Sequence, residues 1–192
     1  MHPTRQDEPH QREPAALLRV RDVVKCFPGV RALDGACLTL RPGEVHALMG
    51  ENGAGKSTLI KVLTGVHAPD AGTIELDGTR IAPSSPRDAE RLGISTVYQE
   101  VNLVPTRSIA ENLCVGRFPR RFGLIDWKAA HRRAEAALDR LGLRLRVGRR
   151  LDESSIAIQQ MVAIARALDA QAKLLILDEP TSSLDESEVD HL

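Results

Sequence analysis

The fold of this chain is decided by the stretch Gly50-Glu51-Asn52-Gly53-Ala54-Gly55-Lys56-Ser57. It fits the phosphate-loop pattern G-x-x-x-x-G-K-[ST] and lies between the apolar segment Val45 to Met49 and the helical run Thr58 to Leu63. Glycines let consecutive N–H groups point inward, and the positive end of the following helix completes a nest for a polyphosphate. We expect Lys56 to reach the β- and γ-phosphates and Ser57 to place its hydroxyl on Mg²⁺. The alternative, a plain glycine-rich turn, does not explain the Lys-Ser pair.

A second apolar run ends in two carboxylates. Residues Lys173 to Leu177 are followed directly by Asp178 and Glu179. This pattern fits a buried parallel strand that delivers both carboxylates at its C-terminal edge, beside the phosphate loop. There Asp178 can hold Mg²⁺ through water, and Glu179 can orient or deprotonate the attacking water. Taken alone, the same residues fit a strand followed by a charged helix cap equally well.

Length and composition indicate one globular domain. The 192 residues are 42% hydrophobic and 27% charged, which is enough apolar material for a buried core. Lys and Arg number 26, as do Asp and Glu, so no basic excess of the whole chain drives binding to nucleic acid or to an anionic membrane. The aromatic content of 3% also leaves little material for a base-stacking platform.

The apolar runs and the cysteines favour a cytoplasmic protein. Every apolar run falls far short of the roughly 20 residues that a membrane helix needs, and no signal-peptide pattern opens the chain. The three cysteines, Cys26, Cys37 and Cys114, are widely spaced and form no C-x-x-C pair. We interpret them as reduced structural thiols.

Residues 1–16 are predicted to form a disordered tail. Met1 to Pro14 contains no Leu, Ile, Val or Phe, so this segment can bury too little to offset the entropy of ordering. His2 and His10 lie in the tail, and we interpret them as solvated residues rather than metal ligands because nothing fixes their geometry.

Beyond the tail, short apolar segments alternate with turn signals such as Pro28-Gly29, Pro42-Gly43 and Asp77-Gly78. The predicted strands are Leu17 to Val24, Cys37 to Leu40, Val45 to Met49, Thr73 to Leu76 and Ile94 to Tyr98.

Helices are predicted where a capping residue precedes an apolar period. Ser85-Pro86 opens a short helix, and Asp126 caps a longer one that runs to about Leu141. In the longer helix, apolar residues recur at helical spacing on one face, and Trp127 is predicted to belong to the core.

Five markers in chain order resemble the ATP-binding cassette (ABC) ATPases, and within them the first cassette of bacterial sugar-importer ATPases of the ribose, galactose and xylose type. The resemblance covers nearly everything from Leu17 onward. The markers are Lys25 to Val30, the phosphate loop, Tyr98-Gln99-Glu100, the run Gln159 to Leu168, and the run Leu177 to Asp185.

The resemblance implies an α/β fold, a P-loop NTPase of ABC type with an N-terminal antiparallel β subdomain. It implies a cassette domain over residues 17–192 with a helical subdomain inserted at about 100–165, whose near edge touches the membrane partner in transporters. The family's switch histidine follows on a later strand, and His191 does not occupy that place. We therefore expect an incomplete domain that lacks its C-terminal strands.

The resemblance also assigns nucleotide-site residues. It implies that Gly50 to Thr58 bind the nucleotide and that Phe27 stacks on adenine, although a plain core phenylalanine would look alike in sequence. It implies that Gln99 senses the γ-phosphate or Mg²⁺.

In this family two cassettes pair head to tail, and each ATP lies between one phosphate loop and the signature motif of the other cassette. The usual signature is Leu-Ser-Gly-Gly-Gln, and the corresponding residues here are Ser154-Ser155-Ile156-Ala157-Ile158. Ser155 and the following helix start can form an anion site for a γ-phosphate, and they can equally well be a serine helix cap.

The function that the resemblance implies is Mg-ATP hydrolysis that energises import of a monosaccharide or similar small solute. The implied partners are a second cassette (homodimer or tandem half), permease subunits and, indirectly, a solute-binding protein, at the cytoplasmic face of the inner membrane and without nucleic acid. One alternative is an ABC ATPase outside transport, but such proteins usually carry coiled-coil insertions or basic arms. Another is a nucleotide-binding module without turnover, because the signature is altered.

Overall fold

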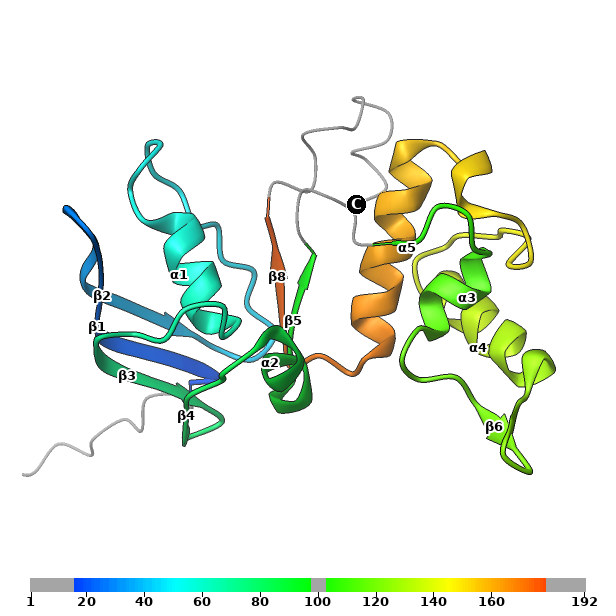
Figure 1. Ribbon diagram of the computed structural model, residues 1–192, viewed down its shortest axis with the longest axis horizontal. Coiled ribbons are helices and arrows are strands. Elements are labelled where there is room, and N and C mark those ends of the chain that lie inside the picture. Colours follow the sequence, from blue (N-terminus) through cyan, green and yellow to red (C-terminus); the bar gives the residue numbers. More distant parts are fainter. Residues whose placement is uncertain (1–15, 98–102, 179–192) are drawn as a thin grey trace, which may run out of the picture. The chain divides into compact units, whose positions relative to one another are not determined.

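The computed structural model describes residues 16–97 and 103–178, which form two compact units. The sheet unit comprises the chain up to Lys56 together with Pro69–Ala82, and the helical unit comprises Ser57–Ala68 and the chain from Pro83 onward (Figure 1). The predicted tail lies outside the described residues except for Ala16. No helix among the described residues is long and apolar enough to cross a bilayer.

The sheet unit is built on a four-stranded antiparallel sheet of order β2-β1-β3-β4. Pro28-Gly29 joins β1 to β2 with Gly29 at φ 79°, and Asp77-Gly78 joins β3 to β4 with φ 51° and 72°, so both predicted turns are confirmed. Leu18, Val20 and Val23 on the central strand β1 are buried. The strands are β1 (Leu18–Phe27), β2 (Val30–Leu40), β3 (Ala71–Leu76) and β4 (Thr79–Ile81).

The strand predicted over Val45 to Met49 is wrong. After β2 the chain turns at Pro42-Gly43, where the Glu44 N–H donates to the Arg41 carbonyl, and it continues without regular structure to the phosphate loop. The Val45 side chain is 100% exposed and that of Met49 is 87% exposed. A strand needs a neighbour for its N–H and C=O groups, and no described strand pairs with this segment. Apolar composition alone therefore does not make a strand here.

The helical unit contains a parallel pair, β5 and β8, in register from Ile94↔Leu174 to Val97↔Leu177. Both strands were predicted, and the parallel orientation predicted for the second is confirmed; their pairing with each other was not predicted. The expectation of a buried β8 holds only for Leu174, because β8 has one neighbour among the described residues. The elements of this unit are α1 (Lys56–Leu63, which begins at the boundary), α2 (Pro86–Leu92), β5 (Ile94–Val97), α3 (Ile109–Cys114), β6 (Arg120–Arg121), β7 (Leu124–Ile125), α4 (Trp127–Asp139), a 3-10 turn (Leu151–Glu153), α5 (Ile156–Asp169) and β8 (Leu174–Leu177).

The helices begin at the predicted capping residues. Ser85 accepts a hydrogen bond from the Asp88 N–H at the start of α2 (3.2 Å), and Asp126 accepts one from the Ala129 N–H at the start of α4 (2.9 Å). Helices α3, α4 and α5 pack around a core that includes Leu113, Leu138 and Val162, each at most 2% exposed.

The prediction that Trp127 belongs to the core is wrong, because the residue is 49% exposed. Trp127 is the first residue of α4 and lies before the buried residues of that helix, which begin at Ala130. Its ring forms a T-shaped pair with that of Phe118, with 5.7 Å between the ring centroids.

All three cysteines are free, but only Cys114 is buried, and burial raises the pKa of its thiol. Cys26 and Cys37 are exposed, and the Sγ of Cys37 accepts a hydrogen bond from the Asp22 N–H at 3.3 Å.

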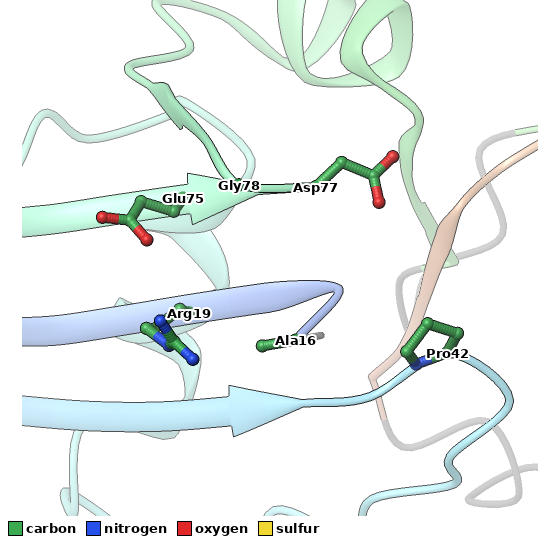
Figure 2. Close-up of a pocket in the computed structure, with 6 residues that line it drawn as sticks. All are labelled: Ala16, Arg19, Pro42, Glu75, Asp77 and Gly78. Carbon is green, nitrogen blue, oxygen red and sulfur yellow. The ribbon is translucent and has the colours of Figure 1, made fainter. Parts of the chain in front are cut away.

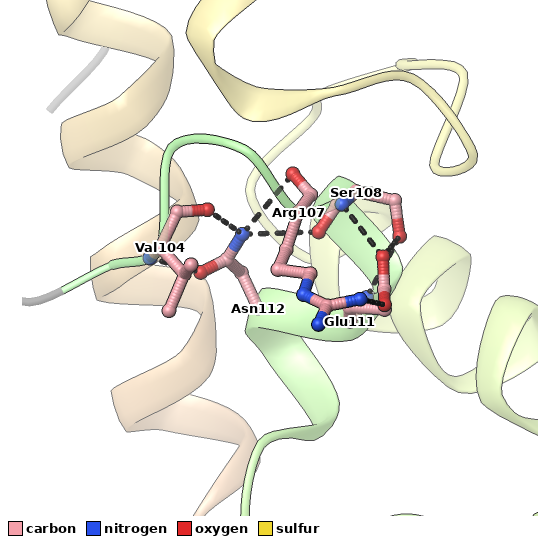
Figure 3. Close-up of polar contacts among 5 residues, drawn as sticks. All are labelled: Val104, Arg107, Ser108, Glu111 and Asn112. Atoms are coloured by element: carbon pink, nitrogen blue, oxygen red, sulfur yellow. Dashed lines mark hydrogen bonds and ion pairs between the residues drawn. The ribbon is translucent and has the colours of Figure 1, made fainter.

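The segment that leads into α3 is held by one buried side chain, Asn112 (Figure 3). Its Oδ1 accepts from the Val104 N–H at 2.7 Å, and its Nδ2 donates to the carbonyls of Val104 and Ser108 at 3.0 Å each. A capping box closes the start of the helix, in which Ser108 and Glu111 exchange hydrogen bonds. We call Asn112 and these partners the Asn112 clamp.

Candidate nucleotide-binding site

The phosphate loop, residues 50–57, turns through two glycines in the left-handed region. Gly53 and Gly55 both have φ 88°, and the Ala54 N–H donates to the Glu51 carbonyl at 3.1 Å. No described residue accepts a hydrogen bond from the backbone N–H of Gly53, Gly55, Lys56 or Ser57. These groups are therefore free to bind an anion, as the motif predicts.

Gly55 is required for a second reason, because the loop passes very close to β2 at this point. A Cβ atom at Gly55 would lie 2.6 Å from the Ala32 carbonyl oxygen and 2.9 Å from Cδ2 of Leu33. Only a residue without a side chain fits this approach and this φ value. The same argument does not apply to Gly53, where an added Cβ meets nothing within 4 Å.

Lys56 places its positive charge over the loop. Its Nζ donates to the carbonyl oxygens of Gly50 at 2.5 Å and Glu51 at 2.9 Å. The side chains of Ser57 and Thr58 follow in the first turn of α1, with Ser57 exposed and Thr58 half-buried. Free N–H groups, one ammonium group and two hydroxyl groups in this order fit a magnesium-bound polyphosphate.

Asp178 lies at the carboxyl end of the parallel pair, as predicted. Its N–H donates to the Val97 carbonyl at 3.0 Å, so the β5–β8 ladder continues one residue beyond β8 and fixes the backbone of Asp178. Residues 50–56 of the phosphate loop belong to the sheet unit, and Ser57 and Asp178 belong to the helical unit. Glu179 and Gln99, the other predicted catalytic residues, lie outside the described residues.

Phe27 ends β1 and is half-buried, so the ring is not part of a closed core. The Nζ of Lys25 lies 5.6 Å from the ring centroid. Asp70 fixes this end of the strand, since its carboxylate accepts from the Cys26 N–H at 2.7 Å and from the Lys25 Nζ at 2.9 Å. These two hydrogen bonds hold the pKa of Asp70 below its ordinary value. Asp70 thus holds the end of β1 next to Phe27, a contact that the sequence patterns did not reveal.

Ser155 caps α5. Its Oγ accepts from the Ile158 N–H at 3.4 Å, and the Gln159 side chain donates to the Ser154 carbonyl at 3.1 Å. The helix-cap alternative is therefore confirmed, and the role of Ser155 toward a γ-phosphate stays a prediction. Ile156, the next residue, is 58% exposed.

A separate hollow of about 330 Å³ lies at the end of the N-terminal sheet where β1 begins and β2 and β3 end (Figure 2). Arg19 and Glu75, which are Cα partners across β1 and β3, place opposite charges in it. Its lining residues are Ala16, Arg19, Pro42, Glu75, Asp77 and Gly78, and none of them is a predicted nucleotide ligand.

Residues 33–182 match the family model described as "ABC transporter". The chain belongs to the ABC transporter ATP-binding family. Over 176 residues the chain is 54% identical to the galactofuranose transporter ATP-binding protein YtfR of Escherichia coli K12. The alignment covers 92% of this chain and 35% of that protein. The chain is 53% identical over 176 residues, with the same shares covered, to ribose import ATP-binding protein RbsA 1 of Rubrobacter xylanophilus. The chain thus spans about a third of the length of these relatives.

Solved structures agree with this assignment. An ATP-binding cassette of an ABC transporter in its ADP conformation has a TM-score of 0.77 at 27% identity, covering 92% of this chain and 73% of that chain. A dimeric post-hydrolysis cassette bound to ADP and Pi has a TM-score of 0.73 at 25% identity, covering 91% of this chain and 78% of that chain. The predicted fold, an α/β ABC cassette with an antiparallel N-terminal sheet, is confirmed.

Proposed function

We propose that this cassette binds Mg-ATP and hydrolyses it to energise import of a monosaccharide or similar small solute through a membrane permease. The observation that carries the proposal is the phosphate loop, which has free N–H groups, holds the Lys56 ammonium on the carbonyls of Gly50 and Glu51, and packs Gly55 against β2. The proposed cassette domain covers residues 17–192, with its helical subdomain at about 100–165. The names of the relatives support a sugar as the solute class.

Each predicted residue has a distinct role in this proposal. Bound Mg²⁺ supplies charge neutralisation at the β- and γ-phosphates. The N–H groups of residues 50–58 and the Lys56 ammonium bind and orient the phosphates, and the Ser57 hydroxyl and the Asp178 carboxylate hold the metal. Glu179 orients or deprotonates water, Gln99 senses the γ-phosphate, and Phe27 provides an apolar face for adenine.

The proposed partners are a second cassette, permease subunits and, indirectly, a solute-binding protein, at the cytoplasmic face of the membrane. In a pair of cassettes, Ser155 and the start of α5 would face the γ-phosphate bound by the other phosphate loop. The dimeric solved relative supports the pairing. The solute itself is selected by the permease and the binding protein.

The test is a calorimetric titration of the chain with Mg-ATP, in parallel with Lys56→Ala and Lys61→Ala. Lys61 is the matched control, because it is an exposed lysine in the last turn of the same helix. We expect Lys56→Ala to lose binding and Lys61→Ala to keep the affinity of the unmodified chain. Equal affinities in all three proteins would contradict the proposed phosphate site.

A second candidate is a nucleotide-binding module without turnover. It is favoured by the cap at Ser155, which already uses the serine hydroxyl, and by isoleucines at positions 156 and 158 of the signature segment. Phosphate release assays on the unmodified chain and Glu179→Gln separate the two candidates. Turnover that Glu179→Gln abolishes supports the ATPase, and binding without turnover in either protein supports the second candidate.

A further inference from the structure

A two-stranded hairpin, β6–β7, projects from the helical unit between α3 and α4 (Figure 1). Its pairs are Arg120↔Ile125 and Arg121↔Leu124, and Phe122-Gly123 forms the tip. Both tip residues are left-handed, with φ 52° at Phe122 and 82° at Gly123. Asn, Asp or Gly normally fills such a turn, and a phenylalanine there is unfavourable for the backbone. Local folding therefore does not account for this side chain.

The hairpin exposes apolar side chains that the fold does not use. Phe122 is 93% exposed, Leu124 is 75% exposed, and Ile125 and Trp127 are 37% and 49% exposed. By comparison, Ile109 and Leu113 of the neighbouring helix α3 are at most 2% exposed. An apolar group of this kind at a tip marks a contact with another molecule.

The charge of the same segment is entirely positive. Arg117, Arg120 and Arg121 lie between Val115 and Ile125, and this stretch contains no Asp or Glu. Within the described parts of the chain neither Arg120 nor Arg121 forms an ion pair, and the Arg121 guanidinium lies 5.4 Å from the Phe122 ring centroid. The whole chain has a net charge of +0, so this positive charge is local.

We propose that the β6–β7 hairpin binds the surface of an anionic lipid bilayer. Exposed arginines beside aromatic and aliphatic side chains fit an interface of negative headgroups above acyl chains. A protein partner is less favoured, because a stable protein interface buries about 800 Å² on each side and a six-residue hairpin offers much less. This contact goes beyond the proposed ATPase function and needs no nucleotide.

The experiment is co-sedimentation of the chain with vesicles of phosphatidylglycerol and phosphatidylcholine in equal parts, and with phosphatidylcholine alone. Trp127, the single tryptophan, reports the hairpin environment through its emission. We expect binding to the anionic vesicles only, with a blue shift of Trp127, and weaker binding at high salt. Arg120→Gln/Arg121→Gln should bind about 30-fold more weakly.

Three further variants separate the proposed contact from effects on folding, on total charge and on ATP binding. Phe122→Asn suits the left-handed tip, so it should fold normally and bind about tenfold more weakly. Arg144→Gln/Arg146→Gln removes the same charge from another exposed segment of the helical unit and should bind as the unmodified chain does. Lys56→Ala should also bind vesicles normally, which separates this proposal from ATP binding. No binding to anionic vesicles, equal loss in both double variants, or protection of the hairpin by a permease alone would overturn the proposal.

Discussion

The phosphate loop and the Asn112 clamp use backbone polar groups in opposite ways. In the loop, the N–H groups of Gly53 and Gly55 have no described acceptor and the surrounding residues are exposed. In the clamp, the Val104 N–H and the carbonyls of Val104 and Ser108 are bonded to the side chain of Asn112, which is fully buried.

This difference predicts that the loop serves ligand binding, whereas the clamp serves the stability of the fold. Free, fixed N–H groups can be satisfied by an anionic ligand, so changes in the loop should alter affinity first. Buried groups satisfied within the protein stabilise it, and removing their partner costs the desolvation energy of each group left behind. Variants in the two regions should therefore give opposite patterns of effect.

The largest effect is expected at Gly55. In Gly55→Ala the new methyl group meets the Ala32 carbonyl, so the loop must shift and its N–H groups lose their alignment. Hydrogen bonds to charged groups contribute about 1.5–3 kcal/mol each, so we expect Mg-ATP affinity at least 100-fold weaker by calorimetry. Gly53→Ala is the control: it has the same φ but no clash, and it should bind more tightly than Gly55→Ala. Equal losses of Mg-ATP affinity in the two variants would show that the positive φ angle, and not the contact with Ala32, requires glycine.

The next effect is on stability, at the clamp. Asn112→Ala leaves the Val104 N–H without its acceptor, whereas the carbonyls of Val104 and Ser108 keep the hydrogen bonds from the backbone N–H groups of Arg107 and Asn112. We expect the free energy of unfolding to fall by about 1–3 kcal/mol in urea titrations. Arg107→Ala is the control, because it removes only an exposed ion pair with Glu111 (3.2 Å) and keeps the Arg107 carbonyl; its cost should be under about 0.5 kcal/mol. A large loss of ATP affinity in Asn112→Ala, with an unchanged free energy of unfolding, would contradict the assignment of the clamp to stability.

These two regions also differ in how far the sequence alone reveals them. The phosphate loop and the caps Ser85 and Asp126 are local patterns, and the structure bears the caps out because their partners lie within a few residues. The contact of Gly55 with β2 joins residues far apart in sequence, so no spacing rule predicts it.

The wrong predictions have a related cause, since a local pattern does not show what a segment contacts in the fold. The segment Val45 to Met49 has strand composition but no described neighbour to pair with, and Trp127 has helical spacing but lies at the helix end. Ser108 and Glu111 fit the S-x-x-E capping signature, which was a usable signal for α3. The bonds of Asn112 to the preceding loop had no such signal.

The capping box makes the stability of the helical unit depend on pH. Hydrogen bonds from Ser108, first from its backbone N–H, hold the pKa of Glu111 below its ordinary value of 4.5. The stabilisation is therefore complete above about pH 4.5 and is lost as the pH falls through the lower pKa of the folded state. Glu111→Gln keeps an acceptor without charge, so we expect it to be about 1 kcal/mol less stable at pH 7, with a gap that closes in acid.

Urea titrations of both proteins between pH 7 and pH 3 measure this gap. Glu135→Gln is the control, because Glu135 is an exposed carboxylate on α4 without a described hydrogen bond or ion pair. A constant difference between Glu111→Gln and the unmodified chain at every pH would show that the charge of Glu111 is not what stabilises the cap.

The smallest effect tests whether a threonine hydroxyl group stabilises the protein only when it forms a hydrogen bond. Thr64 follows α1 directly, and its Oγ1 donates to the Ile60 carbonyl at 2.9 Å, whereas Thr96 Oγ1 on β5 is buried with no partner among the described residues. Both side chains have the shape of valine. Thr64→Val should lower the free energy of unfolding by about 1 kcal/mol, and Thr96→Val should leave it unchanged or raise it by up to about 1 kcal/mol. Paired thermal and urea unfolding measure both changes, and an equal loss in the two variants would mean that Thr96 finds a partner in the folded protein.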